Sequence, residues 1–192
     1  MSDDVPPELL AILQRVRDRG IPGAAEWQGY EDDLDACDAY ELMAGRTLDE
    51  VSEHFRDTVS IMHAGELRCS PRGAFSYYVF AHAAFLLSES AAAESDSASS
   101  FLRLLISREE LDPGSVKELY AELGPLARFV ASRQAYFDAD LRIYGDFNEL
   151  SVRLDALCVQ VRARDPTAPD DRPAAAPAAR RTCARTPRSA GR

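Results

Sequence analysis

The chain has 192 residues, of which 46% are hydrophobic and 28% charged, and its formal net charge is −10. This is the composition of an ordinary globular protein, and it excludes a collagen-like or low-complexity chain. Acidic residues outnumber basic ones by 32 to 22. The acidic body of the chain repels phosphate backbones and is therefore not expected to bind nucleic acid.

The predicted helices begin near the N-terminus, where apolar residues recur at helical spacing between Pro7 and Arg19. Residues 21–29 contain a proline and two glycines and are expected to form a loop. A second helix is predicted over 30–44. The third has the clearest start, because residues 47–50 read Thr-Leu-Asp-Glu, which fits a capping box. Its apolar stripe predicts one helix that continues to Gly65.

Residues 66–73 contain Pro71 and Gly73 and are predicted to form a loop. The next segment, 74–90, is apolar nearly all round, and a helix of that kind is buried on most sides. We therefore expect this helix to lie at the centre of the fold, after which 88–100 forms a connection.

Further helices are predicted through residues 101–106 and from Asp112–Pro113 onward, where an Asp cap precedes Pro at the first helical position. Gly124–Pro125 is expected to break the latter helix, and the next one begins directly after it. A short extended segment is plausible within 138–145, and a last helix is predicted from 147 to 161.

Residues 165–192 differ from the rest of the chain. They hold three acidic residues and six arginines, a charge of +3, which leaves −13 for residues 1–164. Prolines stand here among alanines and arginines, and such a sequence cannot bury enough apolar surface to offset its ordering entropy. We expect a helical domain over 1–164 and a disordered tail over 165–192. The tail is a dispensable extension on one interpretation, and an arginine-rich contact for nucleic acid or an acidic surface on another.

Together these elements predict a single all-α bundle of about seven or eight helices, with antiparallel neighbours joined by short loops. No run of alternating residues supports a β-sheet. The N-terminus has neither the basic start nor the apolar run of a signal peptide, and no apolar stretch is long enough for a bilayer. A cytoplasmic protein without membrane contact is therefore expected, and the oligomeric state is left open.

The sequence contains little that indicates catalysis. It has no G-x-S-x-G, P-loop or G-x-G-x-x-G motif, and its four cysteines have no metal-ligand spacing. The histidines His54 and His63 have acidic neighbours in the sequence, but no H-E-x-x-H or Glu-x-x-His pattern is present. No catalytic residue, metal site or cofactor is predicted.

The most distinctive feature is a run of acidic residues in the second predicted helix. Like charges three and four residues apart on a helix cost stability unless something offsets them. The run is either a solvated face or a docking surface that steers a basic partner. Its members are Glu31, Asp32, Asp33, Asp35, Asp38 and Glu41.

Two functional hypotheses follow. The first is a non-enzymatic acidic protein that engages a basic protein through this run, and an immunity protein that neutralises a toxin is one specific version. The alternative is an enzyme or small-molecule sensor with a pocket between helices, lined by Tyr77, Tyr78 and His82, because helical bundles host such sites.

Overall fold

The computed structural model describes residues 5–159, and every regular element in this range is helical. Eight α-helices have five or more residues, α8 is a single turn, and four 3-10 turns join them. The all-α prediction is confirmed, whereas the predicted tail at 165–192 lies outside the described residues. No helix within 5–159 has the length and apolar character that crossing a membrane requires.

The α-helices are α1 (Pro7–Asp18), α2 (Leu34–Met43), α3 (Leu48–Ser52), α4 (Val59–Cys69), α5 (Arg72–Leu86), α6 (Ser95–Leu111), α7 (Tyr120–Ser132), α8 (Leu141–Tyr144) and α9 (Phe147–Val159). The 3-10 turns are η1 (Tyr30–Asp32), η2 (Glu53–Phe55), η3 (Glu89–Ala91) and η4 (Lys117–Leu119).

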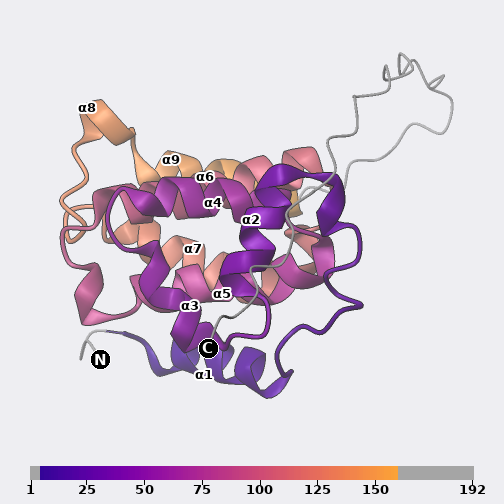
Figure 1. Cartoon of the computed structure of the whole chain (residues 1–192). Coiled ribbons are helices and arrows are strands. Elements are labelled where there is room, and N and C mark those ends of the chain that lie inside the picture. The colour runs from indigo at the N-terminus through magenta and orange to yellow at the C-terminus, as the bar shows by residue number, and fades with distance from the viewer. Residues whose placement is uncertain (1–4, 160–192) are drawn as a thin grey trace, which may run out of the picture.

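Helix α5 is the central element, as its apolar sequence predicts. Helices α1, α3, α4 and α6 all pack on it, and Figure 1 shows α1 on one side of α5 with α4 and α6 on the other. Helix α6 runs opposite to α5, because Phe75 near the start of α5 lies under the guanidinium of Arg108 near the end of α6, 4.8 Å from ring centre to Cζ. At the other end, His82 contacts Ser97.

Helices α4 and α6 lie side by side and run in the same direction. The backbone N–H of Asp57, just before α4, donates to Glu94 just before α6 (2.8 Å). At their far ends, the Arg108 guanidinium donates to the carbonyl oxygens of Arg68 and Ser70. Both ends of this helix pair are therefore fixed by charge-assisted hydrogen bonds.

The predicted single helix from Leu48 to Gly65 is wrong, since the chain breaks between η2 and α4. Asp57 adopts a left-handed conformation (φ 58°) at this break, stabilised by the bond from its N–H to Glu94. Helix α4 then continues through Gly65 to Cys69. The loop predicted over 66–73 shrinks accordingly to Ser70 and Pro71.

Two further boundaries differ from the prediction. Gly124 and Pro125 lie inside α7 rather than breaking it. A Cβ at Gly124 would come within 2.9 Å of Cζ of Tyr120, so the missing side chain lets that ring pack over the first turn. The extended segment considered at 138–145 is instead the single-turn helix α8, whose cap is Asp140 accepting from the N–H of Arg142 (2.7 Å).

A buried carboxylate organises the segment between α6 and α7. Glu109 is 6% exposed and accepts three backbone hydrogen bonds, from Gly114 (2.8 Å), Val116 (2.9 Å) and Lys117 (3.0 Å). These amides lie outside the regular α-helices, and that of buried Val116 would otherwise have no acceptor. The side chain therefore replaces the missing backbone partners of the whole turn.

Glu109→Ala is expected to lower the free energy of unfolding by about 3 kcal/mol, because it leaves the buried N–H of Val116 and two partly buried N–H groups without acceptors. The neighbouring Glu110→Ala is a matched control, since Glu110 makes only an exposed ion pair with Arg153. It should cost less than about 1 kcal/mol. Urea denaturation of both variants measures the difference, and equal losses would contradict the role given to Glu109.

Candidate functional site

All six acidic residues of the predicted run are exposed, and they lie on η1 and α2. We call this set (Glu31, Asp32, Asp33, Asp35, Asp38 and Glu41) the acidic surface. The predicted helix over 30–44 is divided at Asp33, whose side chain accepts from the N–H groups of Asp35 (2.9 Å) and Ala36 (3.1 Å). Asp33 therefore caps α2, which separates the helix from η1.

Along α2 the carboxylates occupy one side of the helix. At about 100° per residue, Asp35, Asp38 and Glu41 fall within an arc of roughly 120°. Ala36 and Met43 lie on the opposite side of the helix and are buried, at 1% and 0% exposure. The carboxylates of α2 therefore face solvent together.

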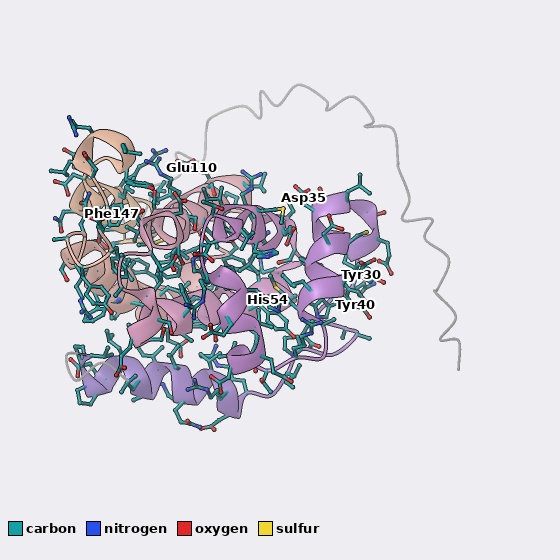
Figure 2. All side chains as sticks on the ribbon, turned by 60° about the vertical axis from the view of Figure 1, so that its left-hand side comes forward. Tyr30, Asp35, Tyr40, His54, Glu110 and Phe147 are labelled. Atoms are coloured by element: carbon teal, nitrogen blue, oxygen red, sulfur yellow. The ribbon has the colours of Figure 1, made fainter. Side chains whose placement is uncertain are left out.

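Aromatic packing holds this part of the chain in place. The rings of Tyr30 and Tyr40 stack at 3.9 Å, and buried Trp27 meets Tyr40 edge-on at 5.2 Å. Figure 2 shows Tyr30, Asp35 and Tyr40 together at one end of the molecule, far from Phe147. We call Trp27, Tyr30 and Tyr40 the platform. Trp27 also packs on Tyr78 of α5 at 5.7 Å, so the platform is joined to the core.

No carboxylate of the acidic surface forms an ion pair with any residue in 5–159. Asp35 accepts only a long bond from the Cys69 thiol (3.7 Å). Glu41 lies in the last turn of α2, where the helix dipole is negative and which contains no basic residue. The arrangement opposes helix stability at Glu41, so stability does not explain this charge.

One group of potential metal ligands occurs in the described part of the chain. The ligand atoms of Asp33, Asp35 and Cys69 all lie within 4.8 Å of one another. Burial and the neighbouring Asp33 carboxylate raise the pKa of the Cys69 thiol. A protonated thiol is a poor metal ligand, so a cation here would depend on two exposed carboxylates.

The structure places Tyr77, Tyr78 and His82, the residues of the predicted pocket, inside the core. Tyr77 is 5% exposed and the other two are fully buried. The Tyr78 hydroxyl donates to the carbonyl oxygen of Arg46 (3.1 Å), and Phe55 stacks on His82 at 4.1 Å. All three side chains are therefore enclosed, and none of them lines either groove described below.

The contacts of His82 also define its protonation. Its Nε2 lies 3.0 Å from the carbonyl oxygen of Ser97, which can only accept, so Nε2 carries the proton. The Ser97 hydroxyl, 3.1 Å from the same nitrogen, therefore finds no base there. Burial lowers the pKa of His82 to about 3 and keeps the ring neutral. This pair is not an activated serine nucleophile.

The other two histidines lie next to one another, although the sequence separates them by a turn. The rings of His54 and His63 are 6.0 Å apart, and Figure 2 shows His54 near the middle of the molecule. Arg46 donates to Nε2 of His54 (3.2 Å), and burial lowers the pKa of His54. Nδ1 of His63 donates to the Glu66 carboxylate (2.8 Å), so this acidic neighbour in the sequence does contact the ring. The contact does not by itself indicate a chemical reaction.

Two open grooves are present in the described structure, and neither contains the predicted pocket residues. One, of about 520 Å³, lies between α1, α3 and α5 and is bridged by the Arg17–Asp49 ion pair (2.7 Å). The other, of about 420 Å³, follows the seam between α4 and α6 and ends at Tyr144 of α8. Sequence reasoning missed both, because the residues that form them come from separate helices.

The comparisons with known proteins provide no relative. No protein-family model matches the chain, and no curated protein or solved structure matches it.

The neutral His82 predicts a specific pH dependence of stability. Its pKa is lower in the folded state than the usual 6.5, so the unfolded chain takes up a proton first as the pH falls. Between pH 7 and pH 5 this uptake should remove about 2 kcal/mol of stability. Urea titrations at both pH values should show a smaller loss for His82→Gln than for the wild type. The same loss in both proteins would contradict a buried neutral His82; His54→Gln serves as the control for a partly exposed ring.

Proposed function

We propose that this protein is a non-enzymatic binding protein whose acidic surface engages a basic protein partner. The observation that carries the proposal is the group of six exposed carboxylates on η1 and α2 that have no ion-pair partner in residues 5–159. Elsewhere in the described chain, many exposed carboxylates pair with arginine. Uncompensated like charge costs free energy in the isolated protein, and a basic partner would offset that cost.

An exposed apolar residue lies within the acidic surface. Leu34, the first residue of α2, is 53% exposed and lies seven residues before Glu41, on the same side of the helix. Binding surfaces commonly combine an apolar contact, which supplies affinity, with a polar rim that excludes wrong partners. The expected partner surface therefore has an apolar depression surrounded by lysine and arginine.

The platform beneath the acidic surface supports rapid and specific association. Stacked Tyr30 and Tyr40 and the buried Trp27 fix η1 and α2 before any partner arrives. Little ordering entropy is then lost on binding, and charge attraction raises the association rate. A protein that neutralises a basic toxin would need this combination of speed and rigidity, which makes an immunity protein one specific form of the proposal.

Reversal of Asp38 and Glu41 to lysine tests the acidic surface without disturbing the cap at Asp33. Both side chains are exposed and have no ion-pair partner in residues 5–159, and the lysine in place of Glu41 would favour the last turn of α2. The double variant should retain or slightly raise the melting temperature, while losing the partner. The control reverses Glu8 and Glu149, exposed acidic residues of α1 and α9, and changes the net charge by the same amount.

The measurement is affinity capture from source cells at low and high salt, followed by kinetics with the captured protein. A single basic protein should bind the wild type and the control in a salt-sensitive way, and associate at least tenfold more slowly with the Asp38/Glu41 variant. Equal association rates for all three proteins would exclude the acidic surface as the binding site.

A further inference from the structure

The groove between α4 and α6 has the size of a small-molecule site. It forms because the seam carries small side chains, with Ala64 and Gly65 on α4 facing Ser99 and Ser100 on α6. The resulting space of about 420 Å³ falls within the usual range for ligand pockets. From Asp96 to Ser107 the groove follows α6 for eleven residues, roughly 16 Å at the helical rise.

Two arginines line this groove, and neither has a carboxylate partner within residues 5–159. Arg103 donates from Nε to the hydroxyl of Ser99 (3.2 Å) and from Nη2 to the carbonyl oxygen of Tyr144 (2.8 Å). These acceptors are neutral, so they hold the guanidinium in place without cancelling its charge. Arg68 lines the groove farther along α4.

Most arginines elsewhere in residues 5–159 have a carboxylate partner, and only Arg15, Arg46 and Arg133 lack one outside the groove. Eight of them form ion pairs with aspartate or glutamate, as expected in an acidic protein: Arg17, Arg19, Arg56, Arg72, Arg108, Arg128, Arg142 and Arg153. Among the described residues, the only carboxylate that lines the groove is Asp96, and it accepts from the Tyr144 hydroxyl (2.9 Å). The positive charge in the groove is thus available to a ligand.

The two arginines are not equivalent. Cys69, the residue after Arg68, lies 3.7 Å from Asp35 of the acidic surface, so nearby carboxylates weaken the positive potential at that end. Arg103 lies about mid-groove and is positioned by two hydrogen bonds, with its Nη1 donors still available. It is the better anchor for an anion.

We propose that this groove binds an amphiphilic organic anion, with an apolar body and one carboxylate or phosphate head group. The head group pairs with Arg103, whose planar donors match both anions. The apolar body lies along Ile61, Ala64 and Leu104, which cover part of the groove with hydrocarbon. This site is separate from the acidic surface and does not depend on the function proposed for it.

Calorimetric titration of the full chain with decanoate, decyl phosphate and decanol tests the chemistry of the ligand. At concentrations below micelle formation, one molecule of decanoate or decyl phosphate should bind per chain. Decanol should bind at least about tenfold more weakly, because it lacks the charge that Arg103 would pair with. The two anions together show whether the site prefers a carboxylate or a phosphate.

Two pairs of variants test the position of the site. Arg103→Gln should weaken decanoate binding about tenfold or more, whereas Arg128→Gln removes the same charge from α7 and should have no effect. Gly65→Leu should block the groove. It is expected to fold, since a Cβ at Gly65 meets no atom within 4 Å and Gly is a poor residue inside a helix. Gly65→Ala keeps the groove open, and should retain binding with a higher melting temperature.

Any of three results overturns the proposal: neither anion binds the wild type, decanol binds as tightly as decanoate, or Gly65→Leu binds decanoate normally while its melting curve shows a folded protein. Decanoate titration of the Asp38/Glu41 variant separates this site from the acidic surface. It should bind normally there, whatever the outcome of the partner experiment.

Discussion

Helix α5 has almost no polar side, and the rest of the structure follows from covering it. Eleven of its fifteen residues are buried, and besides His82 they include five aromatic side chains: Phe75, Tyr77, Tyr78, Phe80 and Phe85. Apolar surface on every side of a helix can leave water only if other helices surround it. Helices α1, α3, α4 and α6 do so, and their places around α5 determine which of their own faces remain exposed.

Enclosing a central helix forces polar groups into the interior, and these groups explain the most irregular parts of the chain. Glu109 supplies acceptors for the turn after α6, while Arg108 binds carbonyl groups at the end of α4. His82 is accommodated by giving up its charge and donating to Ser97. Glu109, Arg108 and His82 thus each bind a neighbouring segment, which ties separate elements of the fold together.

Unpaired charges are distributed unevenly over the surface, and the packing of the core does not require this distribution. Carboxylates gather without partners on η1 and α2, whereas two arginines without carboxylate partners line the groove between α4 and α6. The two regions meet near Cys69, whose thiol contacts Asp35. The proposed acidic binding surface and the proposed anion site can coexist on one small bundle. The Arg68 end of the groove lies near the carboxylates, which weaken its positive potential, whereas Arg103 lies farther along the groove.

The sequence by itself determined the helical class, the central position of residues 74–90 and the exposure of the acidic run. These features depend on periodicity, composition and local charge, which a chain carries before it folds. It also located the capping box at Thr47, because both partners lie within four residues. The acidic residues were predicted as a set, although the division at Asp33 into η1 and α2 was not.

Only the tertiary structure decided where helices stop and which side chains meet. The break at Asp57 depends on Glu94, thirty-seven residues away, and α7 continues through Pro125 although its sequence predicts an end. The sequence places His82 in an apolar helix, but only the fold brings the ring of Phe55 against it. The groove that holds Arg103 is built from α4, α6 and α8 together, so no local pattern records it. Contacts between segments distant in the sequence are set by the packing around α5, and short-range spacing contains no information about them.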